Sequence, residues 1–142
     1  MLPKPIPSLV INYFYLWKYE QQKGQEGGVK QRPCVILSAQ EQESGLRVIV
    51  SPVTTTKPDT GAAIEIPAKV AHYLGLKEDV PSYIVCSEVN LFIWPGVDIS
   101  SIQGDKGKFS FGYLPPKLFD KVKEQILRSN KDKTLKVVAR KS

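Results

Sequence analysis

The sequence predicts a mainly β protein of the α+β class, folded as a compact barrel or strongly bent sheet with a short inserted helix and a C-terminal helix. Short runs of apolar, β-branched and aromatic residues alternate with glycine, proline and polar turns, which is typical of short strands. Only one segment, near the C-terminus, has the apolar period of a long amphipathic helix. The 142 residues, 42% of them hydrophobic, suffice for one core and not for two.

The strands follow from local composition. Residues 9–19 are rich in aromatic and β-branched types, which suit a pleated surface better than a helix. Residues 20–31 contain three glycines and no periodicity, so they predict a loop that returns the chain to the sheet. The further expected strands are Val35–Leu37, Leu46–Val50, Ala63–Ile66, Ser82–Cys86, Leu91–Trp94 and Phe109–Phe111, with turns at 40–45, 58–61, 95–96 and 104–107.

Two helices are expected. Pro67 begins the first and Gly75 follows its end, the usual asymmetry of a short helix. Pro115 and Pro116 open the second, whose apolar residues fall on one face. Those apolar residues are Leu118, Phe119, Val122, Ile126 and Leu127.

The net charge of +6 is concentrated near the C-terminus. Residues 128–142 carry six cations against one carboxylate, Asp132, so only +1 is left for the rest of the chain. This distribution supports a basic tail that phosphate can attract. The charge of +1 on the other residues gives almost no indication of what they bind. We expect one domain over residues 1–128 and a basic tail over 129–142. The tail is expected to be solvated or partly disordered, with an added strand through Leu135, Val137 and Val138 as the alternative.

Cysteine usage and the N-terminal residues bear on the compartment. Cys34 and Cys86 lie in apolar runs without the spacing or companions of a metal site, so we expect core thiols. Residues 1–18 are interrupted by prolines and lack a cleavage site, which predicts neither a signal peptide nor a membrane span. A reducing cytoplasm is the expected compartment.

The strongest candidate for a functional site is Arg32, which stands directly before a proline at the mouth of a strand. Pro33 biases Arg32 towards extended geometry, and an arginine fixed there can fork onto a phosphate. The strand that ends in Ser51-Pro52-Val53 is followed by three hydroxyls and a cation, at Thr54, Thr55, Thr56 and Lys57. We expect these two strand ends to share one polar patch.

Several short pieces occur in a fixed order along roughly residues 9–127. They are Tyr15-Leu16-Trp17 with the glycine-rich loop, Lys30–Ser38, Ser51–Thr54, Ile64–Ala68, Gly75-Leu76, Tyr83–Asn90 and Gly112–Leu114. In this register they resemble the PemK/MazF/Kid family of toxin endoribonucleases, in its longer variants. The resemblance implies an SH3-like small barrel of the CcdB/PemK/MazF type that forms a homodimer and cuts single-stranded RNA such as mRNA. It also implies that no metal or other cofactor is needed and that an antitoxin protein silences the enzyme.

The resemblance implies that Arg32 and Thr54 are the residues tied to cleavage. The implied reaction is attack by a ribose 2′-hydroxyl on the adjacent phosphate, which leaves a cyclic phosphate and a 5′-hydroxyl. A guanidinium is effectively always protonated, so Arg32 suits stabilisation of phosphate charge better than a general-acid role. Thr54 is expected to hold a phosphate oxygen through its hydroxyl.

The strand end at Ser87-Glu88 departs from the family pattern, in which an acidic residue is commonly followed by glutamine. One step along a strand reverses the face, so either Glu88 faces the groove or the carboxylate is lost from the site. Glu88 is the expected catalytic base, with Glu20 as the other candidate. The expected RNA contacts are Glu20, Lys30, Thr55, Lys57, Ser87 and Asn90.

Two other functions stay open. One is a nucleic-acid- or protein-binding barrel that has lost catalysis, which the shifted acidic residue would explain. The other is a CcdB-like poison of a protein target such as a topoisomerase. The pair Arg32 and Thr54 separates them, because only a catalyst needs both groups at one phosphate. Trp17 and Trp94 are expected to pack in the core or in a dimer contact, and His72 to lie at the surface or the core edge.

Overall fold

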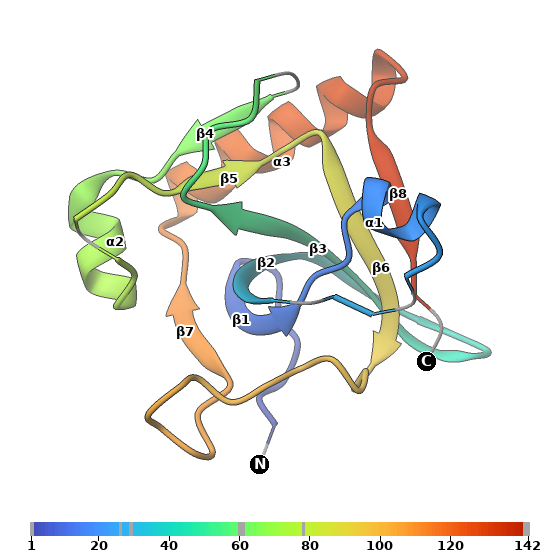
Figure 1. The fold of residues 1–142 in the computed structure, drawn as a ribbon, viewed down its shortest axis with the longest axis horizontal. Helices are drawn as coiled ribbons and strands as arrows, with labels where there is room; N and C mark the ends of the chain where they lie inside the picture. The colour runs from blue at the N-terminus through green and yellow to red at the C-terminus, as the bar shows by residue number, and fades with distance from the viewer. Residues whose placement is uncertain (1, 26, 29, 60–61, 78, 141–142) are drawn as a thin grey trace.

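A computed structural model describes residues 2–25, 27–28, 30–59, 62–77 and 79–140 (Figure 1). The elements in chain order are β1 (Leu9–Phe14), α1 (Lys18–Gln22), β2 (Gln31–Gln42), β3 (Gly45–Thr54), β4 (Ala63–Glu65), α2 (Ala68–Leu74), β5 (Tyr83–Val85), β6 (Glu88–Trp94), β7 (Ser110–Tyr113), α3 (Pro116–Lys131) and β8 (Lys136–Ala139).

The strands form one bent sheet that is mostly antiparallel. Its order is β4-β5-β3-β2-β1-β7. Strand β5 pairs with the end of β3, at Val53 and Thr54, and β6 pairs with the earlier residues 46–50 of β3. Only β8, which pairs with β6, runs parallel to its neighbour among the described strands. The expected mainly β, α+β class is therefore confirmed. The pairings among described residues do not close into a ring, so a closed barrel is not what this structure shows.

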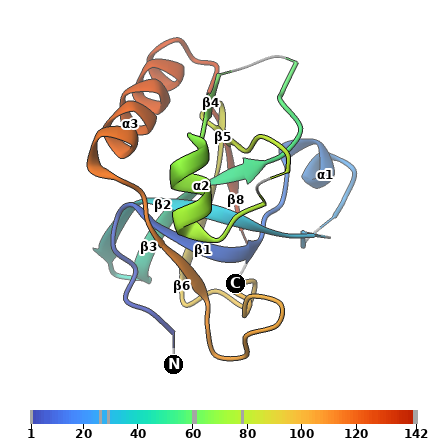
Figure 2. The ribbon, with the colours of Figure 1, turned by 90° about the vertical axis from the view of Figure 1, so that its left-hand side faces the viewer.

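The core has two parts because β1 and β2 alternate their side chains between two faces of the sheet. The paired residues Val10 and Val35 face a cluster that includes Leu74 of α2 and Val122 of α3. Figure 2 shows both helices at this face. The second cluster lies on the other face and consists of Leu9, Ile11, Tyr13, Tyr15, Cys34, Ile36, Val48, Val50 and Phe92.

Both predicted helices are present at the expected positions, and the predicted apolar face of the second helix is wrong at one residue. Pro67 precedes α2, and Gly75 after it has a φ of 72°, the left-handed conformation that suits glycine. The predicted apolar face of α3 packs on the sheet through Leu118, Phe119 and Val122. Leu127, predicted on the same face, is 68% exposed.

Both cysteines are core thiols, as expected. Cys34 and Cys86 are fully buried and free. Burial raises the pKa of the Cys86 thiol to about 12 and raises that of Cys34 as well, so both stay protonated at neutral pH. In the part of the chain that the structure describes, no helix has the length and apolar run needed to cross a membrane.

Two elements differ from the expectation. The first strand ends at Phe14, and α1 follows where a loop was predicted, because Glu20 Oε1 accepts a hydrogen bond from the Trp17 N–H at 3.0 Å and caps the helix. The prediction of a solvated or partly disordered tail is wrong for residues 129–140, and the alternative strand is present as β8, which includes Val137 and Val138 but not Leu135. Helix α3 runs past residue 128, and β8 buries Val138 against β6.

Gly28 lies against the backbone at the end of β1 and makes a testable packing contact. A Cβ at Gly28 would overlap the carbonyl oxygen of Tyr15 and lie 2.7 Å from that of Phe14, whereas a Cβ at Gly27 meets nothing within 4 Å. We expect Gly28→Ala to lower the free energy of unfolding by about 1–3 kcal/mol and Gly27→Ala to change it by less than about 0.5 kcal/mol. Urea unfolding of the two variants measures the difference. Equal effects would contradict the close backbone approach.

Candidate functional site

A cavity of about 200 Å³ lies where the start of β2 meets the end of β3. Its lining residues are Lys30, Gln31, Arg32, Pro33, Val53, Thr54, Thr55, Thr56, Leu76, Lys77 and Ser82. Arg32 and Thr54 therefore share one cavity, as the sequence predicted for the two strand ends. The lining carries three cations and four hydroxyls, and no carboxylate is present among its described residues. Such a donor set suits an anionic group with several oxygens.

The guanidinium of Arg32 is held from two sides. Its Cζ lies 5.2 Å from the centre of the Trp17 ring, a cation–π distance, and its Nη1 donates a long hydrogen bond of 3.4 Å to the Val53 carbonyl. Arg32 Nε is buried and has no hydrogen-bond partner among the described residues. Because a guanidinium has five N–H donors, and one on Nη1 is used and that on Nε is buried, the donors available to a ligand are the remaining ones on Nη1 and Nη2.

The hydroxyl of Thr54 is oriented by its own turn. Its Oγ1 accepts a hydrogen bond from the Thr56 N–H at 3.2 Å. Thr54 is the last residue of β3 and pairs with Tyr83 of β5, which fixes its backbone. With one lone pair occupied by the Thr56 N–H, the O–H of Thr54 is left to donate to an acceptor in the cavity.

Two further polar cavities adjoin this one. A cavity of about 520 Å³ shares Lys30 and Gln31 and is also lined by Phe14, Ser101 and Gln103. A second cavity, of about 310 Å³, shares Lys77 and Ser82 and is also lined by the carboxylates Glu65 and Asp79. The basic cavity therefore shares lining residues with two neighbouring cavities, a different pair with each.

The amide of Gln31, between the first two cavities, has a fixed orientation. Asn12 is buried and donates through Nδ2 to Gln31 Oε1 at 2.8 Å and to the Ser101 carbonyl at 2.9 Å. Since the Gln31 oxygen is thus occupied, its Nε2 faces other partners as a donor.

The two carboxylates expected as bases do not line the basic cavity. Glu88 is buried, and its Oε2 accepts from the Tyr15 hydroxyl at 3.0 Å and the Lys18 N–H at 2.9 Å. Glu20 is buried in its capping role at Trp17. The Glu88 carboxylate therefore does not face the basic cavity, which was the second of the two alternatives expected for it. One step along the strand turns the side chain towards α1 instead.

The expected RNA contacts divide in the same way. Lys30 and Thr55 line the basic cavity. Lys57 is exposed and is not among the residues that line it. Asn90 is fully buried and bonds the backbone of Leu16, and the Ser87 carbonyl accepts from the Lys136 N–H at the start of β8. The Asn90 side chain therefore serves the fold, and neither Asn90 nor the half-buried Ser87 lines the basic cavity.

Sequence reasoning missed three residues of the site. Trp17 was expected to pack in the core or a dimer contact. It does contact the second core cluster and Tyr15, but its ring also supports Arg32. Lys77 and Ser82 enter through the chain between α2 and β5. Trp17 and Arg32 stand at the two ends of the predicted loop 20–31, so the sequence offers a signal for their contact. The approach of Lys77 and Ser82 depends on tertiary packing.

The environment of Glu88 gives a pH prediction. Burial raises the pKa of Glu88 above its ordinary value, although hydrogen bonds from Lys18 and Tyr15 and the charge of Lys136 oppose the rise. The folded state therefore binds this proton more tightly than the unfolded chain, so Glu88 lowers stability as pH rises from the ordinary glutamate pKa through the raised one. We expect Glu88→Gln to be more stable than the wild type near pH 7 and to lose this advantage towards pH 4.5. Thermal melts of both proteins across that range measure it, and an advantage independent of pH would contradict it.

These features define a small, mainly antiparallel α+β protein with a basic, hydroxyl-lined cavity at its strand ends. The family model described as "PemK-like, MazF-like toxin of type II toxin-antitoxin system" matches residues 14–129, and the chain belongs to this family. Members of this family are generally RNA-cleaving toxins, and a type II system pairs its toxin with an antitoxin. Searches among curated proteins and among solved structures gave no match.

Proposed function

We propose that the protein is an endoribonuclease toxin that cleaves single-stranded RNA in the cavity shared by Arg32 and Thr54. The observation that carries the proposal is the convergence of these two groups from separate strand ends on one basic cavity, with available donors on both. The two adjoining cavities offer space for neighbouring nucleotides. A cytoplasmic site of action is part of the proposal, since RNA is the substrate.

In the proposed reaction, the ribose 2′-oxygen attacks the adjacent phosphorus and the bond from phosphorus to the 5′-oxygen breaks. The products are a 2′,3′-cyclic phosphate and a 5′-hydroxyl. Arg32 stabilises the charge that accumulates on the non-bridging oxygens, and Thr54 donates a hydrogen bond to one of them. Because neither a carboxylate nor a histidine is found among the described residues of the cavity, the 2′-hydroxyl proton leaves to water or to a phosphate oxygen, and the leaving 5′-oxygen takes a proton from water.

The direct experiment incubates the purified protein with a mixture of single-stranded RNAs in the presence of EDTA. We expect cleavage to persist, and we expect the new 5′ ends to accept phosphate from a polynucleotide kinase without prior dephosphorylation. Replacing the ribose at a mapped cleavage position by deoxyribose should abolish cutting there. Intact RNA across many sequences, or 5′-phosphate ends, would overturn the proposal.

A binding module without catalysis is the second candidate. It is favoured by the same lack of a carboxylate or histidine among the described cavity residues. Under this alternative, RNA binds with an affinity that falls with salt as phosphate contacts require, but it stays uncut.

We expect the working form to be a homodimer. An apolar groove of about 460 Å³ between the sheet and α3 is lined by Leu37, Ile49, Leu91, Ile126, Leu127 and Val137, among others. Leu127 is largely exposed there, and covering this groove with a second copy would bury it. Leu127→Glu should therefore shift sedimentation equilibrium from dimer to monomer. Val97→Glu, also a change at an exposed apolar residue but outside the groove, should not. A wild-type monomer would contradict the dimer.

A further inference from the structure

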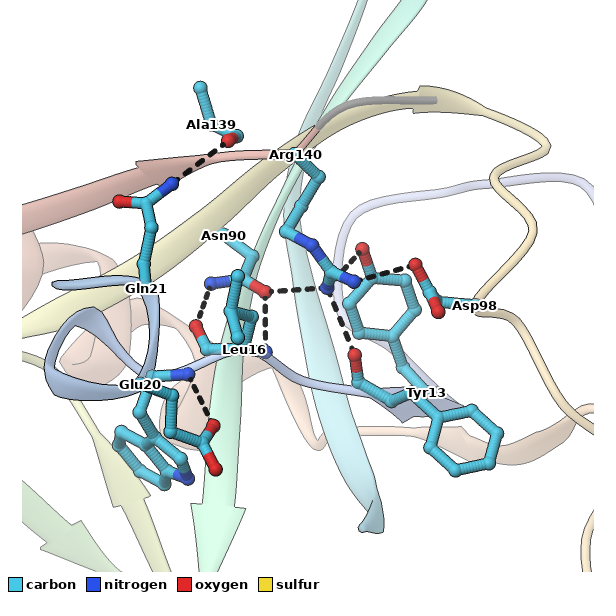
Figure 3. Close-up of polar contacts among 10 residues, drawn as sticks. Tyr13, Leu16, Glu20, Gln21, Asn90, Asp98, Ala139 and Arg140 are labelled. Atoms are coloured by element: carbon cyan, nitrogen blue, oxygen red, sulfur yellow. Dashed lines mark hydrogen bonds and ion pairs between the residues drawn. The ribbon is translucent and has the colours of Figure 1, made fainter. Parts of the chain in front are cut away.

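Arg140 follows β8 and has a side chain only 1% exposed. Its Nη2 lies 2.6 Å from Asp98 Oδ2, and its Nη1 lies 2.9 Å from the Phe14 carbonyl, 3.1 Å from Asn90 Oδ1 and 3.2 Å from the Tyr13 hydroxyl. Figure 3 shows this guanidinium between Asn90 and Asp98, above the ring of Tyr13. One side chain thus connects β8 with β1, with β6 and with the chain that follows β6.

Both β8 and Arg140 lie outside the residues that the family model matches. They are nevertheless joined to the body of the fold. Strand β8 pairs with β6 from Lys136 to Ala139, and the Arg140 N–H continues the pairing by donating to the Leu91 carbonyl at 2.8 Å. Gln21 of α1 also lies 3.5 Å from the Ala139 carbonyl. This C-terminal strand lies beyond the family match and contacts α1 through Gln21.

The segment between β1 and α1 is held by side chains of β6. Asn90 binds both backbone groups of Leu16, since its Oδ1 accepts from the N–H at 3.0 Å and its Nδ2 donates to the carbonyl at 2.8 Å (Figure 3). The same Oδ1 accepts from Arg140. If the Asn90 amide turned over, its NH2 donors would face the Arg140 guanidinium, which has only donors, so Arg140 favours the orientation in which Asn90 binds Leu16.

The residue after Leu16 is Trp17, whose ring supports the guanidinium of Arg32. Tyr15, on the other side of Leu16, contacts the Trp17 ring edge-on with the centroids 4.9 Å apart. A continuous set of contacts therefore runs from Arg140 through Asn90, Leu16 and Trp17 to Arg32. It ends at the group that the proposed reaction uses.

We infer that the C-terminal strand belongs to the cleavage machinery, because Arg140 acts as a positioning residue that holds Trp17 beneath Arg32 by way of Asn90. This inference rests on the proposed function, since Arg32 matters for cleavage only if the protein is a nuclease. It assigns a role to a part of the chain that the family match does not include.

The test compares Arg140→Gln with Val122→Ala, a core substitution in α3 at a residue outside these contacts. Both variants are studied below the onset of their melting transitions. For Arg140→Gln we expect kcat of RNA cleavage per folded molecule to fall about tenfold or more with little change in KM, since a transition-state contact is weakened. For Val122→Ala we expect kcat close to that of the wild type. Equal loss of kcat in the two variants would overturn the inference.

A second readout does not depend on cleavage. The chain has two tryptophans, so the indole N–H signal of Trp17 can be assigned in a nitrogen-15 NMR spectrum with the Trp94→Phe variant. We expect Arg140→Gln to move the Trp17 signal and Val122→Ala to leave it in place. An unmoved Trp17 signal in folded Arg140→Gln would refute the positioning role. If the wild type fails to cut RNA while this signal moves, the proposed function fails and the positioning of Trp17 by Arg140 stands.

Discussion

Arg32→Ala is expected to slow RNA cleavage by about 10²–10³-fold, the usual cost of removing one preorganised donor from a developing oxyanion. The fold should survive, because the Arg32 side chain makes a single long hydrogen bond and one ring contact within the described protein. Its loss therefore removes little packing. Single-turnover cleavage of a defined RNA, with far-ultraviolet circular dichroism to verify folding, measures the effect.

Two companion variants sharpen this prediction. Lys121→Ala removes one cation from the exposed side of α3 and should leave the rate within about twofold of the wild type, since solvated charges far from a site are screened. Arg32→Lys keeps the charge but loses the planar fork and the stacking on Trp17, so its rate should be intermediate. A rate for Arg32→Ala equal to that of Lys121→Ala would remove Arg32 from the mechanism.

Thr54 tests whether the two groups act on the same phosphate. Thr54→Val removes the hydroxyl and keeps the shape of the side chain. If both residues bind the non-bridging oxygens of one phosphate, the double variant should lose less activity than the product of the single losses. Losses that multiply would indicate that Arg32 and Thr54 act at separate places.

Asp98→Asn is expected to cost about 3–5 kcal/mol of folding free energy, the range found when a buried ion pair loses one partner. The reason is the difference in burial between the partners. Arg140 is 1% exposed and cannot regain water, so without the Asp98 carboxylate its charge stays buried and uncompensated. Asp98 is 22% exposed and can be solvated when Arg140 is absent. Arg140→Met, which removes the charge and keeps the volume, should therefore cost less than Asp98→Asn.

Chemical denaturation of the two variants at one pH measures directly which of them loses more folding free energy. The comparison is informative because the same ion pair is broken from either side. If Arg140→Met proves the more destabilising, the hydrogen bonds of Arg140 to Phe14 and Asn90 outweigh the cost of its buried charge. Burial of the Arg140 charge would then not be the dominant contribution to the energetics of this ion pair.

Some of the fold and site could be predicted because local chemistry determines them. Strand alternation, the helix-breaking prolines and the position of Gly75 depend on neighbours in sequence, and they placed most elements. The convergence of Arg32 and Thr54 followed from two strand ends with matching polar residues. The family resemblance added their expected roles, and these remain predictions.

The rest depends on contacts between distant segments. Glu88 points to α1 because Tyr15 and the Lys18 N–H, both about seventy residues away in sequence, supply its hydrogen bonds. Strand β8 was not the favoured prediction, because the many cations near the C-terminus indicated a solvated tail. The burial of Arg140 was not predictable from that pattern, because Asp98, Asn90 and the end of β1 come together only in the folded sheet.

The most direct test of the proposed cleavage site is a crystal structure with an RNA oligonucleotide that carries deoxyribose at its mapped cleavage position. We expect the phosphate to be cut to lie between the Arg32 guanidinium and the Thr54 hydroxyl, within about 3 Å of a donor on each. A phosphate bound elsewhere, with the cavity between β2 and β3 left without RNA, would contradict the assignment of Arg32 and Thr54 to one scissile phosphate.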